Sequence, residues 1–201
     1  MKLATLKDGS RDGQLVVVSR DLSHAHYATG IANRLQQVLE DWGFFAPQLQ
    51  DLSDALNAGR THHAFPFDPQ QCMAPLPRAY QCLQGVAPTS EEGAARPGMP
   101  EMVQLAGDAL LGACADIAAA SLAMEIDFGA GLAVITGDIA TASTPAQALD
   151  GVRLVLLANT LSLRALEARE RAAGQGPLLS RPATAFSPVA VTLDEIGAAW
   201  D

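Results

Sequence analysis

The sequence LAVITGDIATASTPAQALDGVRLVLLA, residues 132–158, places two apolar runs on either side of a polar, turn-rich segment. Residues 132–136 and 152–158 each predict a buried strand, because they are short runs of mostly Val, Ile, Leu and Ala. Thr144 and Pro145 predict a short helix between the strands, since proline is favoured at the first helical position. This alternation is typical of an α/β fold.

The pattern continues toward the C-terminus. Residues 161–173 predict a helix that ends at Gly174, and residues 183–191 predict a strand broken by Pro188. The sequence Thr-Leu-Asp-Glu at 192–195 has the spacing of a capping box that opens a last helical turn. The mixed charges within residues 167–171 indicate a solvated helix face.

The residues before this region predict a small α/β module. Residues 2–6 and 14–19 are β-prone runs joined by a turn-rich segment, which is typical of a hairpin. Apolar residues between positions 31 and 42 recur at helical spacing. We expect a second helix to begin near Pro47 and to end at Gly59.

These patterns divide the chain into three segments: an N-terminal α/β domain at residues 1–80, a flexible connector at 81–101 and a second domain at 102–201. The connector contains GVAPTSEEGAARPGMP, residues 85–100, which is rich in small and polar residues. Residues 105–124 are rich in Ala and Leu, so propensity alone favours a helix there.

Composition and charge exclude several classes of partner. The chain has 201 residues, of which 49% are hydrophobic and 17% charged, and its formal net charge is −9. Such a surface repels nucleic acid and anionic lipid, and no apolar run approaches the roughly 20 residues of a membrane helix. The three cysteines lack metal-binding spacing, so we expect reduced thiols in a cytoplasmic protein.

Long segments of the chain resemble bacterial fumarylacetoacetate hydrolases. DGSRDGQLVVVSRDL (8–22) and AFPFDPQQCMAPLPRAYQ (64–81) resemble the N-terminal domain of that family. MEIDF (124–128) and RPATAFSPVAVTLDEIGAAW (181–200) resemble its second domain. The resemblance implies an α/β (α+β) protein, in which a small N-terminal α/β domain precedes an incomplete, mixed β-roll. For residues 105–124 it implies loop and strand instead of helix.

The family holds a divalent cation between carboxylates, and the resemblance assigns its ligand positions to Gln84, Gly129, Gly131 and Thr160. None of these residues is acidic, whereas Mg²⁺ and Ca²⁺ favour anionic oxygen ligands. The family's catalytic histidine corresponds to the neighbourhood of Glu91, where this chain has no histidine. We therefore expect no metal, no other cofactor and no metal-dependent hydrolysis of a C–C bond.

The charged residues that remain are candidates for other chemistry. The resemblance matches Arg164 to an arginine that binds substrate and Arg181 to a lysine near the metal, so both are candidates for holding a small organic acid. Ordinary surface ion pairs are the alternative. Glu91 and Asp127 are the candidate catalytic carboxylates, although we expect strand alternation to turn Asp127 away from the assigned ligand positions.

Two functions remain open from the sequence. The first is a repurposed, metal-independent enzyme, an isomerase, cyclase or decarboxylase that acts on a small keto acid or polyketide-like anion. The second is a non-catalytic pseudoenzyme that serves as a binding or scaffold partner. The resemblance also implies a substrate pocket. If the side chains of Leu105, Leu110 and Leu111 fill this pocket, the second function is favoured.

A partner is also expected from the resemblance. It implies that family members continue past the position of Asp201 with strands that complete the β-roll. We therefore expect a homo-oligomer or a protein partner to cover the open C-terminal edge.

Overall fold

A computed structural model describes residues 1–86, 101–108, 110–118 and 121–200. Most of its regular structure is one large sheet, made of β1 Lys2–Leu6, β2 Gln14–Val18, β3 His24–Tyr27, β4 Phe65–Pro66, β7 Leu110–Gly112, β8 Ile126–Thr136, β9 Val152–Leu163, β10 Thr184–Phe186 and β11 Ala190–Val191. Their order is β4-β3-β2-β1-β11-β9-β10-β7, and β8 pairs with β9 beside this path. A separate small sheet contains β5 Cys82–Val86 and β6 Glu101–Leu105.

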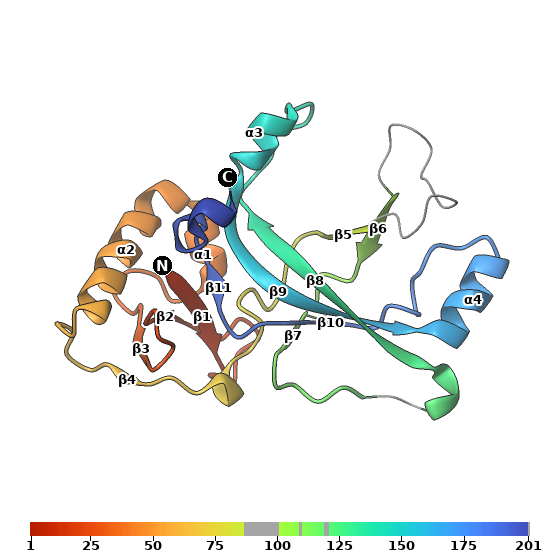
Figure 1. The fold of residues 1–201 in the computed structure, drawn as a ribbon, viewed down its shortest axis with the longest axis horizontal. Helices are drawn as coiled ribbons and strands as arrows, with labels where there is room; N and C mark the ends of the chain where they lie inside the picture. The colour runs from red at the N-terminus through yellow and green to blue at the C-terminus, as the bar shows by residue number, and fades with distance from the viewer. Residues whose placement is uncertain (87–100, 109, 119–120, 201) are drawn as a thin grey trace.

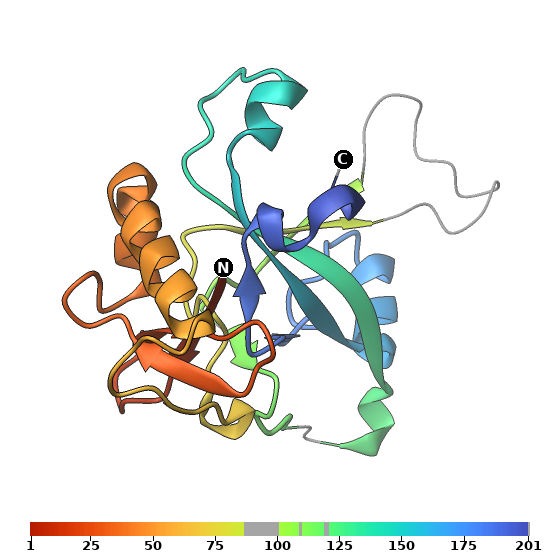
Figure 2. The same cartoon turned by 60° about the vertical axis from the view of Figure 1, so that its left-hand side comes forward.

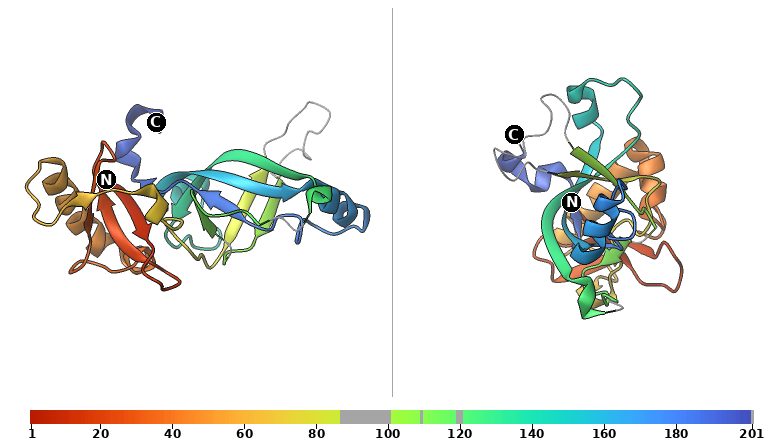
Figure 3. Two further views of the ribbon diagram at one scale, coloured as in Figure 1. Left: turned by 90° about the horizontal axis from the view of Figure 1, so that it is seen from below. Right: turned by 90° about the vertical axis from the view of Figure 1, so that its right-hand side faces the viewer.

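The helices lie around this sheet. They are α1 Leu35–Glu40, α2 Trp42–Asn57, α3 Pro145–Leu149 and α4 Arg164–Ala172, with 3-10 turns at Pro69–Gln71, Leu122–Met124, Leu193–Glu195 and Gly197–Ala199. Figure 1 shows α1 and α2 at one end of the molecule and α4 at the other. The view from below in Figure 3 shows an elongated molecule, in which β8 and β9 extend away from the N-terminal strands.

The N-terminal hairpin is confirmed, because β1 and β2 pair antiparallel along their whole length. The two helices that follow begin at other residues than predicted. The side chain of Asp41 accepts a hydrogen bond from the amide of Phe44 at 3.2 Å, which starts α2 at Trp42. Pro47 therefore lies inside α2 instead of at its beginning.

One hydrophobic core joins the two halves of the chain. It contains Leu3 from β1, Val38 from α1 and Leu154 from β9, all of them fully buried. The sheet is also continuous, since β1 pairs with β11 and β11 pairs with β9. The segments 1–80 and 102–201, predicted as two domains, thus share a sheet and a core.

The ends of the segment predicted as a flexible connector are strands. Cys82–Val86 pairs antiparallel with Glu101–Leu105 to form the small sheet. Residues 87–100, which include Glu91, lie outside the described residues.

No long helix occurs in the described part of residues 105–124, so the helix expected from propensity is wrong. The segment contains loop and strand, as the resemblance implied. β7 pairs parallel with β10 in this segment. The segment also lies against the backbone of Cys72, since a Cβ at Gly112 would lie 2.7 Å from the carbonyl oxygen of Cys72. This close contact between distant segments overrides local propensity.

The strand–helix–strand pattern of residues 132–158 is confirmed, and its strands are longer than predicted. β8 has 11 residues and β9 has 12, and they pair with each other along nearly their whole length, with one register shift after Ile135. Thr144 caps α3 and Pro145 occupies its first turn, as expected. The helix predicted at 161–173 begins only at Arg164, because β9 continues through Leu163. Figure 2 shows this long pair on the side of the molecule away from α2.

The capping box predicted at residues 192–195 is absent. The hydroxyl of Thr192 accepts a hydrogen bond from the amino group of Met1 at 2.5 Å, and no side-chain cap bond forms. The side chain of buried Thr192 therefore binds the residue before β1 and does not cap the 3-10 turn that follows it.

Candidate functional site

Three of the four assigned ligand positions lie together on one face of the β8–β9 pair. Gly129 lies opposite Thr160, and Gly131 follows Gly129 by two residues in a register that is regular from Ile126 to Ile135. Side chains two residues apart on a strand point to the same side. Asp127 therefore shares this face, and the expectation that it turns away is wrong.

Thr160 fills the space beside Gly129. Its hydroxyl donates a hydrogen bond to the carbonyl oxygen of Gly129 at 3.0 Å. A Cβ placed on Gly129 would lie 2.8 Å from the same hydroxyl oxygen, which is closer than real Cβ atoms approach their neighbours. A carboxylate side chain at position 129 would thus require Thr160 to move and to give up its hydrogen bond.

Gly129 and Thr160 belong to a row of residues that lie side by side on neighbouring strands, and uncharged side chains continue this row across the sheet. Thr160 lies opposite Thr184, and Thr184 lies beside Leu110 in β7. Leu110 is one of the three leucines expected to fill the pocket, and the structure places it on this row. Leu111 is the next residue of β7, while Leu105 belongs to the small sheet.

The fourth assigned position lies elsewhere. Gln84 is in β5, where it pairs with Val103 of β6, so it belongs to the small sheet. The structure therefore brings Gly129, Gly131 and Thr160 into one sheet face and places Gln84 in a different sheet. Glu91, assigned to the catalytic histidine, is outside the described residues.

Asp127 and Arg164 form an ion pair at the end of β8. The Nε of Arg164 donates to Oδ2 of Asp127 at 2.8 Å, and its Nη2 also contacts that oxygen. The hydrogen bond from Arg164 is the main cause that lowers the pKa of Asp127, and the charge of Arg181 lowers this pKa further. Both partners are exposed to solvent, so the pair contributes little to stability.

Arg181 lies in the same group of charges. Its Nη2 is 3.5 Å from Oε1 of Glu167, while its buried Nε has no hydrogen-bond partner among the described residues. We call Asp127, Arg164, Glu167 and Arg181 the charged cluster. A buried guanidinium nitrogen without a partner is unusual, because burial of an unpaired polar atom is unfavourable.

A buried carboxylate positions Arg181. Glu170 is only 6% exposed, although the charges of residues 167–171 predicted a solvated face. Its oxygens accept hydrogen bonds from the hydroxyl of Ser180 at 2.5 Å and from the amide of Leu179 at 2.7 Å. The Ser180 hydroxyl is the main cause that lowers the pKa of Glu170, so this carboxylate stays ionised and holds the loop before Arg181.

The donor set on this sheet face does not fit a divalent metal. Gly129 and Gly131 contribute no side chain, and the Thr160 hydroxyl is already engaged. No group of three or more His, Cys, Asp or Glu suited to a metal occurs among the residues that the structure describes. Mg²⁺ and Ca²⁺ require several oxygen ligands, most of them anionic, so Asp127 alone does not make such a site.

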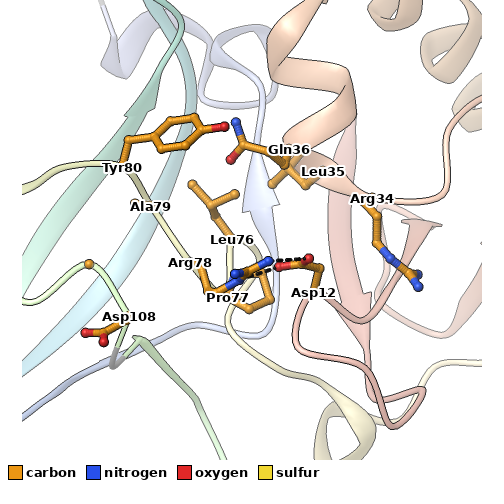
Figure 4. Close-up of a pocket in the computed structure, with 11 residues that line it drawn as sticks. Asp12, Arg34, Leu35, Gln36, Leu76, Pro77, Arg78, Ala79, Tyr80 and Asp108 are labelled. Atoms are coloured by element: carbon orange, nitrogen blue, oxygen red, sulfur yellow. Dashed lines mark hydrogen bonds and ion pairs between the residues drawn. The ribbon is translucent and has the colours of Figure 1, made fainter.

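A cavity of about 440 Å³ lies apart from the charged cluster, between the N-terminal module and residues 76–80 (Figure 4). Both of its arginines are paired: Arg78 contacts Asp12 through two hydrogen bonds of 2.8 and 2.6 Å, and Arg34 lies 2.8 Å from Asp8. Asp108 also lines the cavity. No residue of the charged cluster lines this cavity.

Comparison with known proteins agrees with this architecture. Residues 1–78 match the family described as fumarylacetoacetase N-terminal domain 2, and residues 79–201 match the fumarylacetoacetate (FAA) hydrolase C-terminal family. Together these matches span the chain and define a two-part hydrolase-type fold. The chain belongs to the fumarylacetoacetate hydrolase family.

Solved structures show the same fold. The chain is similar to a fumarylacetoacetate hydrolase from psychrophilic Exiguobacterium antarcticum, with 18% identity and a TM-score of 0.67 over 96% of this chain and 67% of that one. It is also similar to a maleylpyruvate hydrolase from Sphingobium sp. SYK-6, with 16% identity and a TM-score of 0.66 over 98% of this chain and 70% of that one. No curated protein matches the chain closely enough to be compared. No helix in the described ranges has the length and apolar character needed to cross a membrane.

Proposed function

We propose that this chain is a member of the family that does not perform metal-dependent hydrolysis and that acts by binding another polypeptide. The observation that carries the first half of this proposal is the contact between Thr160 and Gly129. It occupies the space that a carboxylate at position 129 would need. The three free cysteines support a reducing compartment, and we expect the protein to act in the cytoplasm.

The state of the charged cluster favours binding over catalysis. Arg164 is engaged by Asp127 and Arg181 is near Glu167, so neither guanidinium is free of a carboxylate. The lowered pKa of Asp127 makes it a weak base, whereas a general base works best with a pKa near the working pH. The position of Leu110 beside Thr184 also agrees with a filled site.

One observation favours a second candidate function. The unpartnered Nε of Arg181, together with the nearby Arg164, would suit the carboxylate of a small keto acid. In that case the protein would be a metal-independent isomerase, cyclase or decarboxylase, with the arginines binding and orienting the anion and Asp127 accepting a proton. Glu91 stays a candidate for this chemistry on sequence grounds alone.

A parallel assay tests the main proposal. We would measure hydrolysis of fumarylacetoacetate with Mg²⁺, Mn²⁺ or Ca²⁺, together with calorimetric binding of each ion, using the Exiguobacterium antarcticum fumarylacetoacetate hydrolase as the positive control. We expect neither turnover nor stoichiometric ion binding by this chain. Metal-dependent turnover would overturn the proposal.

A binding measurement separates the second candidate. Pyruvate and oxaloacetate would be titrated into the wild-type protein, into Arg181→Gln and into the control Arg169→Gln. Arg169 is an exposed arginine of α4 that lies outside the charged cluster. Saturable binding that is lost only in Arg181→Gln would favour the metal-independent enzyme. Equal, negligible heats in all three proteins would favour the binding protein.

A further inference from the structure

His26 contacts two backbone carbonyl oxygens through its two ring nitrogens. Its Nδ1 lies 2.7 Å from the carbonyl oxygen of Tyr27, the next residue of β3. Its Nε2 lies 2.9 Å from the carbonyl oxygen of His62, which belongs to the loop between α2 and β4. We call residues 60–64 the α2–β4 loop. The ring of His26 therefore joins this loop to the large sheet.

This pair of contacts is complete only when the ring of His26 is charged. A carbonyl oxygen can only accept a hydrogen bond, so each ring nitrogen has to donate one. A neutral imidazole carries one N–H group, whereas the imidazolium ion carries two. In a neutral ring, the lone pair of one nitrogen would face a carbonyl oxygen at 2.7 or 2.9 Å, and the two would repel each other. The geometry therefore matches the protonated ring.

His24 on the same strand provides a contrast. Its Nδ1 lies 2.7 Å from the hydroxyl of Ser23. A hydroxyl can both donate and accept a hydrogen bond, so this contact is kept whether His24 is neutral or charged. Histidine side chains change their charge between about pH 5 and 8. Of these two histidines, only His26 has contacts that require the charged form.

The strand that follows the loop has little other support. β4, Phe65–Pro66, is the last strand in the order of the large sheet and pairs with β3 at two positions. The rings of Phe65 and Tyr27 lie 4.8 Å apart. His63 in the loop has a φ of +67°, a left-handed conformation that is unfavourable for residues other than glycine. Loss of one contact of His26 should therefore loosen this segment before the rest of the sheet.

The other charges on the elements around His26 do not take over its contacts. These titratable or charged side chains are His24 and Tyr27 of β3, Arg20 and Asp21 of the β2–β3 turn, Arg60, His62 and His63 of the α2–β4 loop, and Asp51 and Asp54 of α2. β2 and β4 have none. No carboxylate among the described residues forms an ion pair with His26, so the two carbonyl oxygens are the groups that respond to its proton.

We propose that His26 is a pH-sensitive latch that holds the α2–β4 loop against β3 while its ring is protonated. As the pH rises through the interval in which histidines titrate, one carbonyl oxygen loses its donor and the loop opens more often. The stabilisation is thus present in acid and lost at higher pH, the opposite of a carboxylate such as Asp127. This inference is independent of the proposed function, because no residue of the charged cluster takes part in it.

Nuclear magnetic resonance of the histidine rings tests the protonation state. At pH 5, nitrogen-15 chemical shifts should show that both ring nitrogens of His26 are protonated, and hydrogen bonding should slow the exchange of both N–H protons with water. As the pH is raised to 8, the amide signals of residues 61–64 should shift in step with the ring. If the ring becomes neutral while these signals keep their positions, the latch is ruled out.

A matched pair of variants tests the release of the loop. The amide of Phe67, just beyond β4, donates to the carbonyl oxygen of Ser23 at 3.0 Å. Its protection from hydrogen exchange, corrected for the intrinsic effect of pH, should fall by about tenfold between pH 5 and 8, the change expected from losing one charge-assisted hydrogen bond. His26→Gln should abolish this pH dependence, because an amide side chain does not titrate, whereas His24→Gln should preserve it.

Two outcomes of the exchange experiment would overturn the proposal. One is protection that stays constant with pH in the wild-type protein, and the other is a pH dependence that His26→Gln leaves unchanged. Circular dichroism should show that both variants are folded, so that a loss of pH dependence is not a loss of structure. Metal-dependent hydrolysis by this chain would overturn the proposed function and leave the latch standing.

Discussion

Asp127 and Arg164 connect the second residue of β8 to the first residue of α4 through a hydrogen bond of 2.8 Å. The backbone of the same arginine donates to the carbonyl oxygen of Glu125 at 3.0 Å. The end of the β8–β9 pair is thus joined to α4 by both side chain and main chain. The resemblance matched Arg164 to a substrate-binding arginine, but in this structure its side chain and its backbone amide both hold α4 against the end of the β8–β9 pair.

Replacing Arg164 should change the ionisation of Asp127. Arg164→Gln removes the hydrogen bond that is the main cause of the lowered pKa of Asp127, so this pKa should rise toward its ordinary value. Arg181→Gln should raise it less, because Arg181 acts through charge alone. A carbon-detected NMR titration of the Asp127 carboxyl would measure both, with Arg169→Gln as the unaffected control.

The sign of the pH dependence follows from the same shift. A carboxyl whose pKa is lowered in the folded state stabilises the fold above its unfolded pKa, and this contribution is lost as the pH falls through the folded pKa. The difference in urea midpoint between the wild-type protein and Arg164→Gln should therefore shrink in acid. A difference that grows in acid would contradict this assignment.

The contact between Gly129 and Thr160 predicts a specific coupling. Gly129→Ala should destabilise the protein by about 1–3 kcal/mol, because the new Cβ overlaps the Thr160 hydroxyl. In a Thr160→Ala background the same change should cost clearly less. Thr160→Ser is the matched control, since serine keeps the hydroxyl and should give no relief. Urea unfolding of the double-mutant cycle measures the effect.

Glu170 predicts a change in local opening near Arg181. Glu170→Gln removes the anionic acceptor of the Leu179 amide and the Ser180 hydroxyl. Hydrogen exchange at Leu179 should accelerate by about tenfold, the change expected from losing one charge-assisted hydrogen bond. Glu167→Gln, on the same helix, should leave this amide unchanged. Equal exchange in both variants would exclude the anchoring role of Glu170.

The shared core predicts one unfolding transition for the described chain. Leu154→Ala should destabilise the protein by about 2–5 kcal/mol, because Leu154 is fully buried against the N-terminal strands and helices. Circular dichroism and tryptophan fluorescence should give the same urea midpoint. Leu149→Ala is the control, since Leu149 is exposed on α3. Two separate midpoints would show that the N-terminal module unfolds independently.

The three cysteines should differ in reactivity. Burial raises the pKa of Cys72 to about 12, and Cys82 is shifted in the same direction by partial burial, whereas Cys114 is exposed. A disulfide reagent at neutral pH should modify Cys114 rapidly, Cys82 slowly and Cys72 only after unfolding, because the thiolate is the reactive form. Loss of the fast phase in Cys114→Ser checks the assignment.

Local signals in the sequence predicted the elements that depend on neighbouring residues. The β1–β2 hairpin follows from two apolar runs and a turn, and α3 follows from Thr144 and Pro145. The predictions that were wrong concern segments whose structure depends on contacts with residues far away in the sequence. Helix propensity misled at residues 110–112 because they pair with β10, a strand far along the chain. The capping box failed at Thr192 because Met1 uses its hydroxyl.

The candidate site was predicted in part. The resemblance placed Gly129, Gly131 and Thr160 at related positions, and the strand register does bring them to one sheet face. Counting by two along the strand should also have placed Asp127 on this face. The role of Glu170 could not be predicted, because charge spacing along a helix does not reveal a loop that folds back onto it eight to ten residues later.

The pairing of β1 with β11 has a consequence for how this protein is made. Lys2 lies opposite Val191, so β1 leaves the ribosome long before the strand that pairs with it has been translated. Contacts of such long sequence separation slow folding. During synthesis, the apolar N-terminal hairpin is exposed beside an unfilled position in its sheet, which makes the nascent chain a candidate client for chaperones that shield unpaired strands.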